Sequence, residues 1–453
     1  MTGPVAAVAG VLASRMARLA LGAVTGVLIA RTLQPEGRGV YAVISTAAGT
    51  AIILGHFSLE RSQIALWPDP SRHRRLTTNA LVLGMALGSV AALAALGLVA
   101  AGGSAGALPL WAVALLAVPF GTASVNLTNI LLLQSRTTTV NWSTTIAALT
   151  QCVPILTLVA AGRVTVTSVV VCWAVSTAVP FLFVIRALWP ISLRCEKGLV
   201  RRQLSLSGRY HAGHVAFILL LNVDVLLLDA MDSAAVVGVY TVAGTLMGLA
   251  RIPAEAITQV VLPQQAVGCA DEAGHITART LRVTLVVSAV FIGLVAAAAP
   301  WMVPLVYGHA FAASVVPLLV LAPGAVALTL MRPAEQYLVR LGRPMTMSAI
   351  CWGSLAVNLL LNLAAIPRWG AAGAALASTV AYTLMAFLET TWFLRTARVP
   401  VSWLVPRLAD LRWSPALPRE PAAARIPVSR GETPPVAVAE RAAASMNKAP
   451  RIR

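Results

Sequence analysis

Long apolar runs, separated by short polar breaks, follow one another along most of the chain. A helix needs about 20 predominantly apolar residues to cross the hydrocarbon core of a bilayer. The runs therefore predict an all-α polytopic membrane protein with about twelve transmembrane helices. The predicted spans lie near residues 5–30, 39–57, 78–101, 108–134, 144–161, 165–188, 211–230, 235–262, 281–306, 313–338, 346–366 and 371–394.

Composition excludes a soluble globular protein. Hydrophobic residues make up 58% of the chain and charged residues 11%, with a mean hydropathy of +0.81, whereas soluble domains carry about 25% charged residues. The sequence has no Walker-type glycine loop, G-x-S-x-G elbow, H-E-x-x-H pair or C-x-x-C spacing. We therefore expect no enzyme activity, no metal site and no cofactor beyond a possible coupling ion, H⁺ or Na⁺.

The basic residues predict the orientation of the spans. The chain has 34 basic and 16 acidic residues, an excess that in a membrane protein marks cytoplasmic loops rather than a nucleic-acid partner. One set of alternate connections carries thirteen bases. The positive-inside rule assigns that set to the cytoplasm and predicts that both termini are cytoplasmic. The other set holds only four, Arg31, Arg38, Arg163 and Arg368.

An internal repeat divides the spans six and six. Residues 39–49 read GVYAVISTAAG and residues 238–248 read GVYTVAGTLMG, so that six of eleven positions agree at an offset of 199. The alternative is a chance match in a biased composition. Parallel repeats are typical of transporters that bind substrate between two rocking halves. The predicted parts are an N-terminal lobe, a basic amphipathic cytoplasmic connector, a C-terminal lobe and a disordered basic cytoplasmic tail, at 1–190, 191–210, 211–398 and 399–453.

Ionisable residues inside spans are the candidate functional residues, because each costs roughly 2.5–3.5 kcal/mol to insert unless it faces a cavity or a partner. Arginine suits bidentate contact with phosphate, so the arginines predict a cationic cavity for an anionic headgroup. The alternative is that the two Arg/Glu combinations are structural ion pairs. The cavity candidates are Arg15, Arg18, Arg251 and Arg332, and the acidic candidates, for ion coupling, are Asp224, Glu255 and Glu335.

Other polar and small residues have packing interpretations. We expect hydrogen bonding between helices for most amides of the set Asn126, Asn129, Gln134, Gln151, Asn358 and Asn362. His211 and His214 are expected to be interfacial rather than metal ligands. The G-x-x-x-G spacings at 22–26, 84–88 and 244–248 predict closely packed helices.

Two segments resemble a known family. GVLIARTLQPEGRGVYAVIS, residues 26–45, is similar to the junction of the first two spans in bacterial polysaccharide flippases of the Wzx type. NLLLNLAAIPRWGAAGAALASTVAY, residues 358–382, resembles the last two spans of the same flippases. These belong to the multidrug/oligosaccharidyl-lipid/polysaccharide exporter superfamily. Fourteen spans are typical of the related lipid II flippases, and the polar tail here offers no further pair.

The resemblance implies two pseudo-symmetric six-helix lobes around a central cavity in a bacterial cytoplasmic membrane. It implies a flippase that moves a polyprenyl-diphosphate-linked oligosaccharide to the outer leaflet by alternating access. Expected partners are this substrate, membrane lipids and a polysaccharide polymerase or glycosyltransferases. Three alternatives remain open: a cation-coupled multidrug exporter of the same superfamily, a membrane polymerase or glycosyltransferase, and a scaffold without transport.

Overall fold

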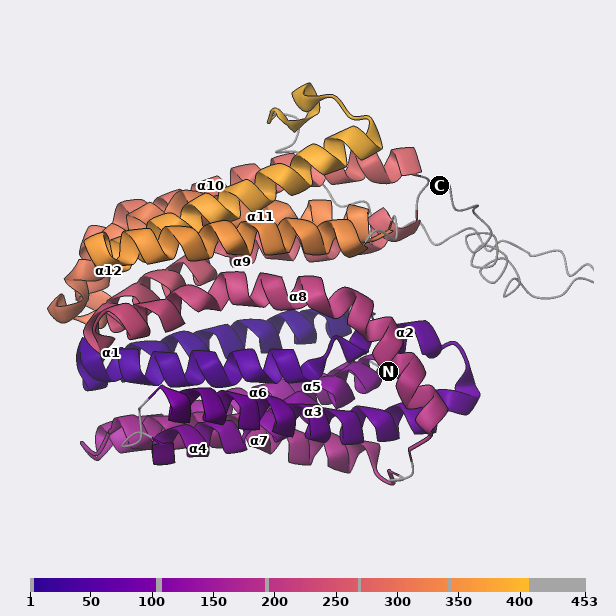
Figure 1. Ribbon diagram of the computed structural model, residues 1–453, viewed down its shortest axis with the longest axis horizontal. Coiled ribbons are helices and arrows are strands. Elements are labelled where there is room, and N and C mark those ends of the chain that lie inside the picture. The colour runs from indigo at the N-terminus through magenta and orange to yellow at the C-terminus, as the bar shows by residue number, and fades with distance from the viewer. Residues whose placement is uncertain (1–3, 103–107, 192–194, 268–269, 341–343, 407–453) are drawn as a thin grey trace, which may run out of the picture. The chain divides into compact units, whose positions relative to one another are not determined.

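The chain folds almost entirely into helices. The computed structural model describes residues 4–102, 108–191, 195–267, 270–340 and 344–406, and the helices run lengthwise beside one another (Figure 1). Short 3₁₀ turns connect some of them, such as η1 at Pro70–Arg72 and η3 at His309–Ser314, and η4 at Val401–Leu404 follows the last α-helix. The α-helices are α1 Pro4–His56, α2 Leu59–Leu66, α3 His73–Ala101, α4 Leu108–Leu116, α5 Val118–Leu133, α6 Thr137–Ala160, α7 Val166–Leu188, α8 Lys197–Met231, α9 Ala234–Val267, α10 Ala270–Tyr307, α11 Val315–Arg340 and α12 Pro344–Ala397.

The predicted polytopic all-α fold is confirmed. Among the described residues, ten helical stretches are long and apolar enough to cross a membrane. Two of them, in α1 and α12, each join two helices across a kink, at Gln34 and at Gly370. Counting each joined stretch as two crossings gives the twelve crossings that the hydropathy pattern predicts.

The kinks follow from local backbone chemistry. Gln34 has φ 56° and ψ 178°, and it precedes Pro35, which disfavours helical geometry at the residue before it. Gly370 has φ 50° and ψ −127°, a conformation that glycine adopts without the steric penalty of a Cβ atom. Each kink reverses the chain between two spans without an extended loop.

The bounds differ from the prediction where hydropathy carries little signal. Helix α2 was not predicted, because it is short and amphipathic rather than uniformly apolar. Helix α8 begins at Lys197 instead of near 211, so part of the predicted connector is helix continuous with the next span. The predicted span at 108–134 consists of two helices, α4 and α5, that meet at Ala117. Of the predicted tail, residues 407–453 lie outside the described residues.

The helices form two groups, here called the first lobe (α1–α7) and the second lobe (α8–α12). Within the first lobe α3 contacts α5 and α6 contacts α7, while in the second lobe α12 contacts both α8 and α11. In Figure 1 the indigo and purple helices of the first lobe lie below the pink, orange and yellow helices of the second. Contacts between the lobes are made mainly by α1 with α8 and α9, and by α2 with α8.

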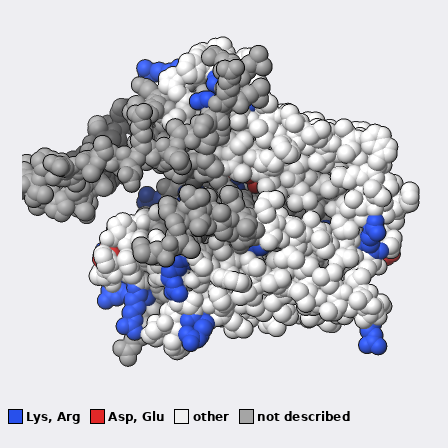
Figure 2. Space-filling model, turned by 180° about the vertical axis from the view of Figure 1, so that it is seen from behind, with Lys and Arg blue, Asp and Glu red and all other residues white. Residues whose placement is uncertain are grey.

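The outer surface is suited to lipid. Large apolar side chains lie on it uncovered, including Leu98 at 76%, Trp301 at 75% and Leu305 at 74% exposure. Figure 2 shows Lys and Arg gathered toward the ends of the visible face, with almost no charge between them. Such a belt would be unfavourable in water, and it matches the hydrocarbon layer that the spans are long enough to cross.

Candidate functional site

The two copies of the repeat meet where α1 crosses α9. A Cβ atom on Gly39 would lie 1.7 Å from the carbonyl oxygen of Ala234, and one on Gly238 would lie 2.0 Å from the carbonyl oxygen of Pro35. Only glycine permits this approach of two backbones. We call this contact the crossing. The repeat therefore marks equivalent positions that pack directly against each other between the lobes.

Arg31 makes a second contact between the lobes near the crossing. From α1 its Nε donates to the carbonyl oxygen of Val306 at 2.7 Å, and its guanidinium also donates to the carbonyl of Leu305. Both carbonyls belong to the last turn of α10, where helix carbonyls lack partners within the helix. A cation is favourable at this end of a helix dipole. The crossing and Arg31 together hold the two lobes closed at this end.

A cavity begins between the lobes beside the crossing and continues along α8, α9 and α11 of the second lobe. Its first part, the crossing chamber, has a volume of about 1000 Å³ and is lined from α1, α8, α9, α11 and α12. The next part, the middle chamber, has a volume of about 970 Å³. Leu221, Arg251 and Leu328 line both chambers, so the two parts adjoin.

Hydroxyl groups are the main polar lining of the crossing chamber. Tyr41 and Thr46 line it from the first copy of the repeat, and the equivalent Tyr240 and Thr245 line it from the second. The chamber is thus nearly symmetric in its chemistry, with donors and acceptors on both lobes. Such groups suit a hydroxyl-rich ligand such as a sugar.

Two of the predicted cavity arginines line the chambers. Arg251 lines both and Arg332 lines the middle chamber. Each also forms the ion pair that the alternative interpretation proposed, Arg251 with Glu255 at 2.8 Å and Arg332 with Glu335 at 3.1 Å. Pairing and cavity lining are therefore compatible, because the pairs lie at the cavity wall and the Nε of Arg251 keeps no hydrogen-bond partner among the described residues.

The other two predicted arginines, Arg15 and Arg18, are not among the described residues that line the chambers. Arg18 is half-buried on α1 and is not among the residues that line the two chambers. The side chain of Arg15 lies outside the part of the chain whose side chains are described.

Arg38 is a cavity arginine that sequence reasoning assigned to a loop. The kink at Gln34 is so short that Arg38 already stands in the second helix of α1, where its side chain is 9% exposed and lines the crossing chamber. Its guanidinium lies 5.7 Å from the centre of the Tyr41 ring, and its Nε has no hydrogen-bond partner among the described residues. A buried arginine with unused hydrogen-bonding capacity is suited to an anion.

Asp224 lies behind the chamber wall rather than in it. Its side chain is 1% exposed and accepts hydrogen bonds from the hydroxyls of Tyr240 and Ser378, the latter at 2.9 Å, and from the backbone N–H of Val225. Because Tyr240 lines the crossing chamber, its side chain lies between the Asp224 carboxyl and the cavity. The carboxyl is fully engaged in the observed conformation.

The amide prediction holds for three of the six residues. Asn129 donates to Gln63 at 2.6 Å, Gln151 donates to the Tyr41 hydroxyl at 3.2 Å, and Asn358 donates to Ser378 at 3.5 Å. Each of these bonds joins two different helices or the two halves of a kinked helix. The amides therefore brace the lobes internally.

Close helix packing was predicted at three G-x-x-x-G spacings, and it is found at one of them. A Cβ atom added to Gly84 would lie 2.6 Å from Cα of Ala123, and one added to Gly88 would lie 2.8 Å from Cα of Pro119. Both glycines therefore pack closely against a neighbouring helix, as expected. The prediction for 22–26 and 244–248 was wrong, because a Cβ there would meet no described atom within 4 Å. Gly244 instead lines the crossing chamber, where a small residue leaves space for a ligand.

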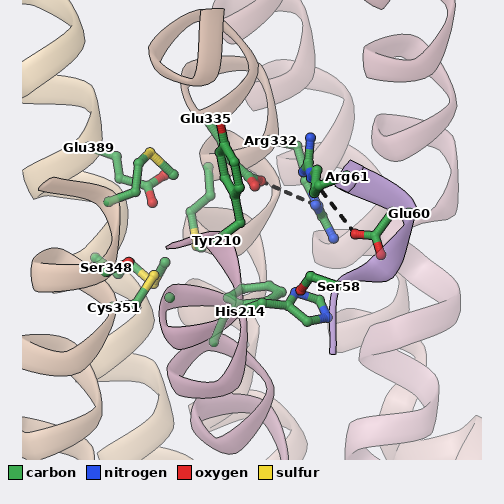
Figure 3. Close-up of a pocket in the computed structure, with 15 residues that line it drawn as sticks. Ser58, Glu60, Arg61, Tyr210, His214, Arg332, Glu335, Ser348, Cys351 and Glu389 are labelled. Carbon is green, nitrogen blue, oxygen red and sulfur yellow. Dashed lines mark hydrogen bonds and ion pairs between the residues drawn. The ribbon is translucent and has the colours of Figure 1, made fainter. Parts of the chain in front are cut away.

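A third space, the connector pocket, lies where α2 faces the second lobe (Figure 3). It has a volume of about 650 Å³ and shares Phe217, Met331 and Arg332 with the middle chamber. Figure 3 places Glu389, Ser348 and Cys351 on one side of the pocket and Glu60 and Arg61 on the other. His211 belongs to the same end, with its Nδ1 3.3 Å from the Ser58 hydroxyl. Among the described residues, no group of three metal-ligating side chains forms here or elsewhere.

Solved structures with the same fold are membrane transporters. The lipid II flippase MurJ in an inward closed conformation aligns with a TM-score of 0.68 at 13% identity, covering 87% of this chain and 88% of that one. An inward-facing multidrug resistance transporter of the MATE family aligns with a TM-score of 0.65 at 12% identity, covering 84% and 94%. The Vibrio cholerae MATE transporter VcmN aligns at 0.60 with 14% identity, covering 87% and 96%. At these identities the likeness shows a shared fold.

The sequence comparisons identify the family. No curated protein matches the chain. A family model described as polysaccharide biosynthesis protein matches residues 7–266, which is more than half of the chain and includes the whole first lobe and both copies of the repeat. Because this match covers more than half of the chain, the chain belongs to the polysaccharide biosynthesis protein family.

Proposed function

We propose that the protein is a flippase that carries a polyprenyl-diphosphate-linked oligosaccharide from the cytoplasmic to the outer leaflet. The observation that carries the proposal is the charge of the cavity wall. The crossing and middle chambers are lined by three arginines, Arg38, Arg251 and Arg332, and by one carboxylate, Glu255. A cavity with this excess of guanidinium groups suits a diphosphate.

The row of arginines suggests a path for the headgroup. Arg332 lines the connector pocket and the middle chamber, Arg251 lines the middle and crossing chambers, and Arg38 lines the crossing chamber. A diphosphate passed along this row would exchange hydration for paired charge at each step, which lowers the cost of leaving water. The sugar would lie against the chamber hydroxyls while the prenyl chain stays in lipid between the lobes.

The proposed orientation places the connector end in the cytoplasm. The thirteen bases of the predicted cytoplasmic set include those that flank α2 and the start of α8. The closed crossing then faces outward, and the observed conformation would be the one that loads substrate from the cytoplasm.

Three carboxyls are proposed for ion coupling, with H⁺ or Na⁺ as the ion. Glu255 and Glu335 each hold one cavity arginine, so an ion that neutralises either carboxylate would release that arginine to the substrate. Asp224 would act through Tyr240, which lines the crossing chamber. Arg15 and Arg18 remain proposed substrate residues on α1.

The alternative function is a cation-coupled multidrug exporter, since MATE transporters share the fold. A cationic cargo would require uncompensated carboxylates in the cavity. The one carboxylate that lines the two chambers, among the residues described, is paired with Arg251. The charge of the lining therefore favours the flippase.

The test is the leaflet position of the lipid-linked oligosaccharide in a strain that lacks the gene. We expect completed units to accumulate on the cytoplasmic face, where an external probe cannot reach them. Wild type should restore access, and the double variant Arg38→Ala/Arg251→Ala should lower the restored flux at least tenfold. Arg136→Ala is the matched control, because that arginine is exposed and its Nη1 donates to the carbonyl of Ala187, away from the chambers.

Other outcomes would contradict the proposal. Full rescue by the double arginine variant would remove the cationic cavity from the mechanism. Normal outward-facing units with loss of long polymer would indicate a polymerase or scaffold. Normal units with increased sensitivity to cationic drugs would indicate the exporter.

A further inference from the structure

Glu389 is a buried acidic residue that the ion-coupling set above does not include. It lies on the second half of α12, its side chain is 0% exposed, and neither carboxyl oxygen has a hydrogen-bond partner among the described residues. Asp224, which is buried to a similar degree, accepts three hydrogen bonds. A polar group enclosed without partners costs free energy, so a carboxyl kept there without donors requires an explanation.

The carboxyl of Glu389 lines the connector pocket, where groups from both lobes meet (Figure 3). It is therefore enclosed by protein but adjoins a space that can admit water or an ion. From α11, Arg332 and Glu335 line the same pocket. The other titratable groups that line the pocket are Tyr210 and His214 of α8, Cys351 of the first half of α12, and Glu60 and Arg61 of α2.

The surroundings fit a proton better than a metal cation. The pocket wall next to Glu389 includes the thioethers of Met347 and Met385 and the thiol of Cys351. Hard cations bind several oxygen ligands, but the Glu335 and Glu60 carboxylates that also line the pocket are already paired, with Arg332 and His56 respectively. A proton requires only the carboxyl oxygen itself, and burial without donors disfavours the charged carboxylate.

We propose that Glu389 is a proton-binding site that controls Arg332 through charge. With the proton bound, Glu389 is neutral and Arg332 stays paired with Glu335 at 3.1 Å, as observed. When the proton leaves to solvent, the new carboxylate competes with Glu335 for the same guanidinium. Since Arg332 also lines the middle chamber, loss of the proton draws a cavity charge toward α12. Proton occupancy thereby sets the charge that the substrate meets.

The coupling also reaches the contact between the lobes. Arg332 stands 5.4 Å from the centre of the Phe217 ring, and the pocket is bounded on the first lobe by Ser58, Glu60 and Arg61. Movement of Arg332 toward α12 would withdraw it from α8 and change the packing at the connector end. This inference rests on the proposed transport function, but the proton site itself can be tested without any substrate.

The experiment uses the purified full chain in lipid nanodiscs without oligosaccharide. Infrared difference spectra between pH 5 and pH 9 record the stretching band of protonated carboxyls, and spin labels at Arg74→Cys and Met345→Cys report the distance between the lobes. Cys195 and Cys269 are replaced by serine, while the buried Cys152, Cys172 and Cys351 are kept. The test variant is Glu389→Gln, which mimics the protonated form in shape and charge.

We expect wild type to show a titrating carboxyl band that Glu389→Gln lacks, and a pH-dependent distance distribution that the variant holds in its low-pH form. Asp69→Asn is the matched control, since that carboxyl is exposed and accepts from Ser71 at 2.6 Å outside the pocket. Glu389→Asp should keep a titrating band. That result would show that substitution at this position does not by itself remove the band through misfolding.

Three results would overturn the site: an unchanged carboxyl difference band in Glu389→Gln, an unchanged pH response of the distance, or a distance shift caused by NaCl against KCl at constant pH. Failure of the flippase proposal looks different. In that case the proton-dependent band and distance would persist, but lipid-linked oligosaccharide would neither bind nor change leaflet.

Discussion

At the scale of single residues, glycines that belong to the same repeat have different structural roles. Gly39 and Gly238 permit the backbones of α1 and α9 to touch. Gly248, the last residue of the second copy of the repeat, faces open space instead. The difference depends on which face of the helix meets the other lobe. Both kinds of glycine belong to the same repeat, so only the packed structure separates a contact glycine from one that faces open space.

Gly238→Ala should therefore destabilise the closed crossing. The new methyl would lie 2.0 Å from the carbonyl oxygen of Pro35, a backbone atom that cannot rotate away. Overpacking of this kind costs about 1–3 kcal/mol, more than the roughly 0.5–1 kcal/mol that alanine gains over glycine within a helix. Thermal unfolding in detergent should show a lower midpoint for Gly238→Ala and an equal or higher one for the control Gly248→Ala. Equal midpoints in the two variants would show that the crossing tolerates a side chain.

The same scale explains which site residues the sequence revealed. Arg251 and Arg332 lie within long apolar runs, and hydropathy alone marks them as costly. Arg38 was hidden because it lies in a predicted loop, and the backbone reversal at Gln34 that brings it into the cavity depends on a single non-helical residue. Glu389 carries the same signal as the arginines, an ionisable group within a span, so the sequence alone marks it as a candidate.

At the scale of elements, the spans were predictable and their ends were not. Burial of apolar residues in lipid determines where each helix crosses, and this is encoded residue by residue. The start of α8, by contrast, is stabilised by tertiary contacts: Arg75 pairs with Glu196 at 2.5 Å, directly before the helix begins. Helix α2 packs on α8 with Leu59 and Leu66 buried. Neither contact is visible in local hydropathy.

Kinked helices are the elements on which both lobes depend, and Gly370 provides a direct test. Its φ of 50° strains any residue with a side chain, and an added Cβ would lie 2.9 Å from a carboxyl oxygen of Asp232. We expect Gly370→Ala to lower the free energy of unfolding by about 1–3 kcal/mol, the usual cost of such backbone strain. Denaturant titration in detergent, with Gly353→Ala of the same helix as control, measures it. A loss of stability in both variants would point to general intolerance of α12 rather than to the kink.

At the scale of the whole molecule, the two ends of the cavity are built differently. The crossing closes one end by backbone contact between equivalent repeat segments, with Arg31 bonded to the end of α10. The connector end is held by polar and aromatic contacts, such as Phe57 against His211 with ring centres 4.6 Å apart. Alternating access requires that contacts at one end break as those at the other form, without either lobe unfolding. Direct hydrogen bonds between the lobes are the contacts that set this balance.

Arg31→Ala should shift the balance toward opening at the crossing. Its two bonds to the carbonyls of Val306 and Leu305 are exposed to solvent, so we expect a shift of about 1–2 kcal/mol in the conformational equilibrium, which is roughly tenfold in population. Spin labels at Arg163→Cys, between α6 and α7, and at Ala313→Cys in η3 should report longer distances in the variant. Arg368→Ala is the matched control at the same end, because that guanidinium donates to the carbonyl of Ala364 in its own helix at 2.6 Å. If the two variants gave the same distance distribution as wild type, the crossing alone would hold the lobes closed, and Arg31 would serve only to cap α10.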